Sequence, residues 1–564
     1  MPGRLALSGG LAHVSEHATM AGMRVDAILR GRFVTFEPAR PLAHTLAVLG
    51  GRIVAIDGDA EGLRSAHEED FGKHPVFPGF HDAHCHTTSF GLALAALDLS
   101  TPPICSLEDL YAAVAAEAER KGSHEWIIGN GYDQNKLGGS HPDLRRLDGA
   151  GGGRPVWLQH TSGHMCMLNS AALAIVGSAA LAAPIVGGAV VTDADGEPTG
   201  LLQERAQALV QRIVLPRSID ELAGAIARAH ERYLSEGLTS VCDAGVAGGW
   251  VAQSPLELAA YQLAHERRQL RVRTTAMITS DATHAVDSHR DDAIAVALDT
   301  GMRTGFGDEW LRLGALKVFS DGSLIGRTCW MHEGFSDDAG NTGYPQADPD
   351  ELRRTIVNAH LAGWQVATHA IGDAAVVFTL DCYEEALRRR PRPDHRHRIE
   401  HCGVTTDASL GRIGQLGVIP VPQGRFVGEI GDGMLAALGP KRVAEAYRLA
   451  GFARSGIVLP GSSDRPVVDG RPLLGMRDMV VRQTESGRPF SPQEALTAEE
   501  ALIAYTSGSA YATRTEHDRG SIAAGKLADL VVVADDPRRL PPADIGDVPV
   551  LATIVGGDVA FRAG

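Results

Sequence analysis

The sequence contains few cysteines and no long apolar run. Its seven cysteines are scattered along 564 residues without a CxxC pair, which argues against a disulfide framework and favours a reducing compartment. No apolar stretch approaches the roughly 18 residues that a membrane-spanning helix needs, and the first twenty residues lack the apolar segment of a secretory signal. We therefore expect a cytoplasmic protein without a membrane partner.

Positive charge is also scarce. The 53 Lys and Arg side chains are outnumbered by 69 Asp and Glu side chains, which gives a formal charge of −16. A general nucleic-acid binder needs a basic surface, so this balance argues against that class of protein. The chain of 564 residues exceeds the roughly 250 residues of a simple barrel. We expect one large domain with additions, or several domains.

The stretch Phe77–His86 combines an apolar strand pattern, a Pro-Gly pair and closely spaced histidines. Residues i and i+2 of a strand point to the same face of a sheet. His84 and His86 can therefore hold one metal ion together. The alternative is an ordinary strand end whose histidines pair with nearby carboxylates.

Short strand patterns separated by glycine turns occupy both ends of the chain. Residues 25–75 contain Gly50-Gly51 between two apolar runs, which is a hairpin signal, and residues 515–564 contain three further apolar segments. Because a short β segment must bury one face, we predict one small β-sandwich built from both termini. The alternative is two separate β tails. Residues 1–24 are predicted to form a disordered leader.

Helix and strand patterns alternate between these ends, over residues 76–514. One helix is bounded clearly, by Ser218 as its N-cap and by Gly237 as its stop. Repeated strand–helix units favour a parallel sheet, and eight of them favour a closed barrel. The eight predicted strands are 77–86, 238–243, 271–278, 311–319, 364–369, 397–401, 417–421 and 456–460.

One spacing in this pattern is anomalous. About 150 residues separate His86 from Leu238, whereas a strand–helix–strand crossover needs far fewer. We predict an insertion over about residues 100–215. Since it follows the carboxyl end of the first barrel strand, it should hang over the active-site face.

The carboxyl ends of the predicted strands carry potential metal ligands, at the positions where barrel enzymes place catalytic groups. Four imidazoles and a carboxylate suit a divalent ion such as Zn²⁺. A single strand histidine is more often a packed, hydrogen-bonded residue, so the shared placement is what indicates a metal centre. The predicted set is His84, His86, Lys317, His369, His401 and Asp464.

Lys317 is unusual within its apolar strand, because a buried ammonium is costly unless it is paired or neutral. Our interpretation is a lysine that has taken up CO₂, since desolvation supplies the neutral amine that this addition requires. The resulting carbamate has two oxygens and can bridge two metal ions. The alternative is a salt bridge to Asp321 or to another carboxylate.

These motifs together resemble the amidohydrolase superfamily of metal-dependent hydrolases, and more narrowly its YtcJ-like subgroup, which includes N-substituted formamide deformylases. The broad resemblance rests on residues 78–86, 368–373, 399–401, 461–464 and 525–530, and the narrower one on residues 317–323, 162–164 and 169–170. It covers residues 25–564 and implies a distorted (β/α)8 TIM barrel with the terminal sandwich. The subgroup often has Asp two residues before the Gly-His of the insertion; Thr161 and Ser162 stand in this region instead.

The resemblance implies hydrolysis of an amide C–N bond by a metal-activated hydroxide, at a site with one or two divalent ions. Asp464 is expected to take the proton of the water and pass it to the leaving nitrogen. His164 is expected to reach over the metal and donate to the developing oxyanion, the alternative being a surface-loop histidine. Further substrate contacts are predicted for Arg327, Trp330, Gln423 and Arg425.

The expected substrate is a small, neutral, formamide-like N-substituted amide. The apolar residues Trp157, Met165 and Met167 of the insertion are expected at the pocket rim, unless they pack inside the insertion. The alternative functions are a deaminase or a cyclic-amide hydrolase of the same superfamily and, less favoured, a metal-binding scaffold without activity. A homodimer is the default expectation for assembly.

Overall fold

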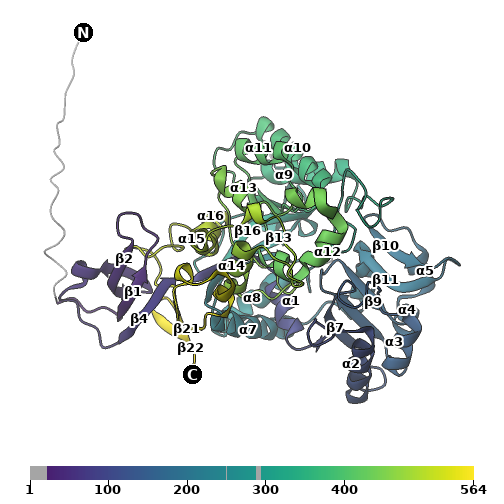
Figure 1. Cartoon of the computed structure of the whole chain (residues 1–564), viewed down its shortest axis with the longest axis horizontal. Helices are drawn as coiled ribbons and strands as arrows, with labels where there is room; N and C mark the ends of the chain where they lie inside the picture. Colours follow the sequence, from purple (N-terminus) through teal and green to yellow (C-terminus); the bar gives the residue numbers. More distant parts are fainter. Residues whose placement is uncertain (1–21, 249–250, 287–293) are drawn as a thin grey trace, which may run out of the picture.

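The computed structural model describes residues 22–248, 251–286 and 294–564. Most of the predicted leader, residues 1–24, lies outside the described residues. Figure 1 shows three parts along the long axis of the molecule: a β unit built from the first and last described segments of the chain, a barrel wrapped by helices, and an insertion at the opposite end.

The central part is a nearly closed barrel of seven parallel strands, in the order β19-β18-β17-β16-β13-β12-β5. Most of these strand residues are buried, as expected where helices cover a parallel sheet. The parallel α/β barrel that the sequence predicted is confirmed. The strands are β5 (Phe80–Cys85), β12 (Leu238–Val246), β13 (Arg273–Thr279), β16 (Leu311–Phe319), β17 (Val366–Ala370), β18 (Arg398–His401) and β19 (Ile419–Val421).

The predicted eighth strand, residues 456–460, is wrong, because this segment forms no β-ladder. The next residues close the barrel mouth beside β5 instead, through three main-chain hydrogen bonds. The N–H groups of Ala83, Asp464 and His86 donate to the carbonyls of Gly461, His84 and Arg465, at 2.9, 2.7 and 2.8 Å. Asp464 has a φ of +61°, which a regular strand does not adopt, so a ladder cannot continue through it.

Helices follow the barrel strands and cover the outside of the barrel. The predicted N-cap is present, since the Ser218 side chain accepts from the Glu221 N–H at the start of α7. None of the described helices has the length and apolar character needed to cross a lipid bilayer. The main helices are α1 (Thr87–Ala93), α7 (Ile219–Ser235), α8 (Glu257–Glu266), α9 (Pro349–Leu361), α10 (Asp373–Arg389), α11 (Asp407–Leu416), α12 (Arg425–Arg442) and α14 (Pro472–Val481).

Residues from both terminal regions form one seven-stranded sheet, β22-β21-β20-β4-β1-β2-β3, which carries two apolar clusters of its own. Strand β4 lies between β1 and β20 and leads through Gly79 into barrel strand β5. The buried ion pair of Arg273 with Asp529, 2.6 Å, ties this sheet to barrel strand β13. The strands are β1 (Ala27–Val34), β2 (Leu42–Leu49), β3 (Arg52–Ile56), β4 (Glu68–Pro78), β20 (Leu530–Val533), β21 (Val550–Val555) and β22 (Asp558–Arg562).

The segment between α1 and α7 builds a six-stranded sheet of its own, β10-β11-β9-β8-β7-β6, with two separate apolar clusters. An inserted unit therefore does follow the first barrel strand, as the sequence predicted. Its main elements are β6 (Leu97–Asp98), α2 (Leu107–Arg120), β7 (Ile127–Tyr132), α3 (Leu144–Gly151), β8 (Val156–His160), β9 (Met165–Leu168), α4 (Ser170–Val176), β10 (Gly188–Thr192), β11 (Pro198–Glu204) and α6 (Ala208–Val214).

Candidate active site

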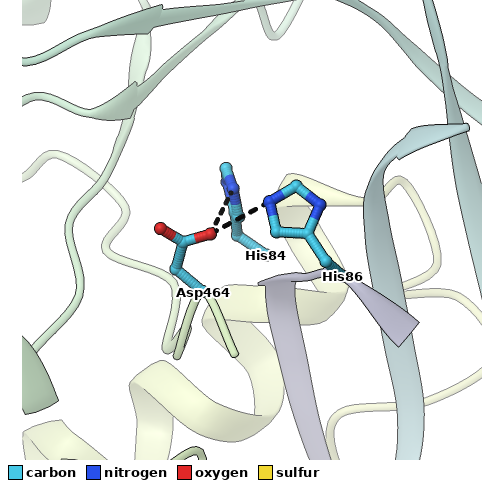
Figure 2. A group of neighbouring side chains, drawn as sticks. All are labelled: His84, His86 and Asp464. Carbon is cyan, nitrogen blue, oxygen red and sulfur yellow. Dashed lines mark ion pairs between the residues drawn. The ribbon is translucent and has the colours of Figure 1, made fainter. Parts of the chain in front are cut away.

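His84, His86 and Asp464 converge at the carboxyl mouth of the barrel (Figure 2). Asp464 Oδ1 lies 3.3 Å from His84 Nε2 and 3.1 Å from His86 Nε2. The ligand atoms that the three residues offer all lie within 4.8 Å of one another. Ligands bound tetrahedrally to zinc at about 2.0–2.2 Å lie about 3.3–3.6 Å apart. The spacing therefore fits coordination of a single ion.

Buried polar atoms without partners mark the same place. Among the described residues, His84 Nε2, Asp464 Oδ1 and Lys317 Nζ are buried and have no hydrogen-bond partner. Such atoms are costly and rare in folded proteins. A divalent cation would give the imidazole nitrogen and the carboxylate oxygen the partner that each lacks, so this donor set fits a metal ion.

The remaining predicted ligands lie beside these three. The ring centroid of His401 is 4.9 Å from that of His84 and 4.5 Å from that of His369. The structure thus brings together the histidines from the ends of β5, β17 and β18. Lys317 on β16 lies within the electrostatic influence of Asp464 and Glu400, which places it at the same mouth.

Hydrogen bonds outside the ligand group fix which ring nitrogen faces it. His84 Nδ1–H donates to Glu400, and His401 Nδ1–H donates to Gln423 Oε1 at 2.7 Å. His369 Nε2–H donates to the Gly322 carbonyl at 3.1 Å. Each ring keeps one unprotonated nitrogen, which is the arrangement usual for metal-binding histidines.

Burial and neighbouring charges set the protonation of the group. Burial lowers the pKa of His401 to about 3 and that of His369 well below its ordinary value, which keeps both rings neutral as metal binding requires. Burial alone would raise the pKa of Asp464, but the adjacent imidazoles of His84 and His86 hold it well below its usual range. The carboxylate is therefore ionised.

Two ligand candidates have left-handed backbone conformations. The φ angles are +66° at His401 and +61° at Asp464, and such angles in non-glycine residues are costly and concentrate at functional sites. The positive φ at His401 ends the regular strand geometry of β18, in which side chains point alternately to the two faces of the sheet. Glu400 and His401 can therefore both approach His84, although successive strand residues normally point to opposite faces.

Two acidic residues that sequence reasoning did not select organise this mouth. Glu400 accepts a hydrogen bond from His84 Nδ1–H. Arg398 donates two further hydrogen bonds to Glu400, at 2.7 and 2.8 Å. Asp82 accepts from the N–H groups of His84 and Ser463, at 3.0 and 3.1 Å, and so fixes β5 against the loop that carries Asp464. The signal available in the sequence was their position beside ligand residues.

A small pocket opens over the ligand group. His164 from the insertion lines its roof, and its ring centroid lies 5.0 Å from that of His369. Burial alone would lower the pKa of His164, but the carboxylate of Glu204, 2.7 Å from Nδ1, raises it above the ordinary value. Apolar side chains form most of the walls, including Leu324, Ile325, Ile371, Phe426, Ile430 and Met434.

Three predicted substrate contacts do not line this cavity. Arg327 is bound by Asp337 and by the Ile325 carbonyl, and Arg425 is paired with Asp478 and Glu429 at 2.6 and 2.9 Å. Trp330 packs on Phe378 of α10, with the ring centroids 5.6 Å apart. These side chains already have partners in the structure, and their role as substrate contacts stays a prediction.

The other rim predictions also change. Gln423 uses Oε1 to hold His401 and Nε2 to donate to Val421 and Ser462, so it positions a ligand and does not line the cavity. Trp157, Met165 and Met167 are at most 2% exposed and belong to the apolar clusters of the insertion. The alternative that they pack inside the insertion is the one observed.

Residues 73–561 match the model of the Amidohydrolase family. The chain belongs to this family. It is 32% identical over 555 residues to Protein LONG AFTER FAR-RED 3 of Arabidopsis thaliana, with 95% of this chain and 92% of that protein covered. The identity is 30% to the Putative amidohydrolase YtcJ of Bacillus subtilis, with 86% of this chain and 89% of that protein covered. It is 28% to the N-substituted formamide deformylase of Arthrobacter pascens, with 96% and 99% covered.

A solved structure shows the same fold as this amidohydrolase. An uncharacterized metal-dependent hydrolase from Pyrococcus horikoshii OT3 superposes with a TM-score of 0.70 at 24% sequence identity, with 92% of this chain and 99% of that chain covered. The family resemblance predicted from the sequence is confirmed. The chain is an enzyme of the metal-dependent amidohydrolases, which act on carbon–nitrogen bonds, and its donor set agrees with that.

Proposed function

We propose that this amidohydrolase cleaves the C–N bond of a small, neutral N-substituted amide, with an N-substituted formamide as the simplest case. The observation that carries the proposal is the cavity over the ligand group, which no described Lys or Arg lines. Apolar walls with a few polar groups suit a neutral ligand. The similarity to the formamide deformylase of Arthrobacter pascens supports the same substrate class.

The chemistry divides between the metal and the side chains around it. A divalent ion, which we propose to be zinc, would activate water and polarise the substrate carbonyl. His84, His86, His369, His401 and Asp464 are the residues that would hold it. Asp464 would accept the proton of the attacking water and deliver it to the leaving nitrogen. His164 would donate a hydrogen bond to the oxygen on which charge develops.

Lys317 is proposed to be carboxylated: its neutral amine adds to CO₂, forms a C–N bond and releases a proton. Burial lowers the pKa of Lys317 to about 8, and Nζ has no hydrogen-bond partner among the described residues. The alternative partner Asp321 accepts main-chain N–H groups of Ile371, Gly372 and Trp330 instead. Labelling with ¹³C-bicarbonate should give a carbamate signal that Lys317→Met loses; an unmodified lysine beside a single metal ion would contradict the proposal.

Matched substrates test the proposed function. We expect zinc-loaded enzyme to prefer N-benzylformamide over N-formylphenylglycine, which adds only a carboxylate, by about tenfold or more in kcat/KM, or about 1.4 kcal/mol. A tenfold preference for the charged substrate would show that the cavity recognises anions. Release of ammonia from an amino-heterocycle, without turnover of either formamide, would favour the deaminase alternative.

A further inference from the structure

Glu204 is the last residue of insertion strand β11, and its carboxylate is fully buried. The carboxylate accepts hydrogen bonds from His164 Nδ1 at 2.7 Å, from Gln346 Nε2 at 2.7 Å and from the Thr328 hydroxyl. Among the described residues, His164 is the one basic side chain within 4.0 Å of it. A buried carboxylate is costly, so its placement here needs a reason.

The backbone around Glu204 is built for this contact. Glu204 has a φ of +51° and a ψ of −127°, a costly conformation for a residue with a side chain. Its N–H also donates to the His164 carbonyl at 2.7 Å. A Cβ at Gly322 would lie 2.4 Å from Glu204 Oε1, so only glycine at that position lets the carboxylate approach the loop after β16.

We propose that Glu204 is the positioning residue of His164. Its carboxylate holds the Nδ1 proton of His164 and so directs Nε2 of the ring away from Glu204. Its bonds to Thr328 and Gln346 fasten the insertion to the barrel loop over the ligand group. This inference rests on the role given to His164 in the proposed function.

Kinetics of Glu204→Gln test the proposal. The amide has nearly the same shape, but its single acceptor oxygen cannot serve three donors. We expect kcat to fall about 10- to 100-fold, while KM changes less than about threefold and the bound metal is retained. In a His164→Ala background the same change should have almost no further effect, because the two residues act as one unit.

A surface acid of the insertion supplies the matched control. Glu108 makes an exposed ion pair with Arg146, and Glu108→Gln should leave kcat and KM unchanged. Equal losses from Glu204→Gln in the wild-type and His164→Ala backgrounds would overturn the proposal. So would an unchanged kcat in Glu204→Gln.

A spectroscopic readout separates this proposal from the proposed function. In ¹⁵N-histidine-labelled, zinc-loaded protein, both ring nitrogens of His164 should carry a proton, with Nδ1–H bound to Glu204 and Nε2–H as the proposed donor to the substrate oxygen, and Glu204→Gln should remove the Nδ1 proton. An unchanged His164 spectrum would overturn the positioning role whatever the substrate. Failure of wild-type enzyme to hydrolyse any amide would overturn the proposed function alone. If Glu204→Gln does not fold, Gln346→Leu removes one donor that holds the carboxylate and should shift both readouts in the same direction.

Discussion

Two groups of buried or half-buried histidines lie at opposite ends of the same barrel strands. The mouth cluster, His84, His86, His369 and His401, lies at the carboxyl ends of β5, β17 and β18. The floor cluster, His360, His395 and His397, lies where β17 and β18 begin. Burial lowers the pKa of His369 and His401 in the first group and of all three residues in the second. Burial and pKa therefore do not distinguish a functional cluster from a structural one.

Hydrogen bonding does distinguish them. In the floor cluster every ring nitrogen has a partner. His397 Nδ1 accepts from the Val366 N–H and its Nε2–H donates to His360 Nδ1, at 3.0 and 2.7 Å. His395 accepts from the His397 N–H and donates to a carbonyl, and His360 also donates to a carbonyl. In the mouth cluster, His84 Nε2 and Asp464 Oδ1 lie 3.3 Å apart, and neither atom makes a hydrogen bond to a described residue. We infer that the ring nitrogens of the floor cluster are satisfied by hydrogen bonds within the protein. The polar atoms of the mouth cluster are satisfied only when a metal ion is bound.

Asp464→Asn should impair catalysis at the mouth cluster without destabilising the fold around the floor cluster. The amide cannot accept a proton, so we expect kcat to fall about 10²- to 10⁴-fold, the range of general acid–base catalysis, with the thermal midpoint nearly unchanged. Steady-state kinetics and calorimetry on one preparation measure both. Asp394→Asn, in an exposed ion pair with Arg396, is the control. Turnover of Asp464→Asn near the wild-type level would assign the proton transfer to another group.

His397→Ala should destabilise the fold without affecting the metal site. It removes the acceptor of the Val366 N–H and the donor to His360, and leaves buried groups unpaired. We expect the free energy of unfolding to fall by about 2–4 kcal/mol, while the metal content of the folded protein stays at the wild-type level. Urea unfolding and elemental analysis test this pair of outcomes. A loss of metal as large as that of a mouth variant would remove the distinction between the clusters.

The pH dependence of the free energy of unfolding should reveal the lowered pKa of a histidine in the floor cluster. Burial lowers the pKa of His360 to about 4, so in the folded state it stays neutral where the unfolded chain, with a pKa of about 6.5, takes up a proton. This contribution is full above about pH 6.5 and is lost as the pH falls toward 4, at up to about 1.4 kcal/mol per pH unit.

His360→Gln supplies the control for this pH dependence. Glutamine can still donate and accept hydrogen bonds, but it does not titrate. The free energy of unfolding, measured by urea at several pH values, should fall less steeply with decreasing pH in the variant than in the wild type. Identical slopes would show that His360 titrates normally in the folded chain.

Local patterns in the sequence predicted the barrel well, and they singled out His84, His86 and Asp464, which the structure brings together at its mouth. Strand ends, helix caps and the His84–His86 spacing depend on neighbours in the chain, and β16 has the predicted bounds, Leu311–Phe319. The eighth strand failed because its place is taken by a loop that Asp464 turns through a positive φ. Whether the metal site holds zinc, and whether Lys317 is modified, stay predictions.

Side chains whose partners are far away in the chain could not be interpreted from sequence. Arg425 is neutralised by Asp478, 53 residues away, and an unpaired arginine and a paired one have the same sequence signature. Glu204 gains its role from His164, Thr328 and Gln346, which only the fold brings together. Sequence indicated the ligand group, but the charge and shape of the cavity above it required the structure.

The metal content of three proteins tests the central claim most directly. Elemental analysis of the wild type, of the His84→Ala/His86→Ala double variant and of His397→Ala should be made on folded, dialysed protein. We predict about one to two divalent ions per chain, mainly zinc, in the wild type and in His397→Ala, and almost none in the double variant. Equal metal contents in all three, or full activity of a metal-free wild type, would contradict the account.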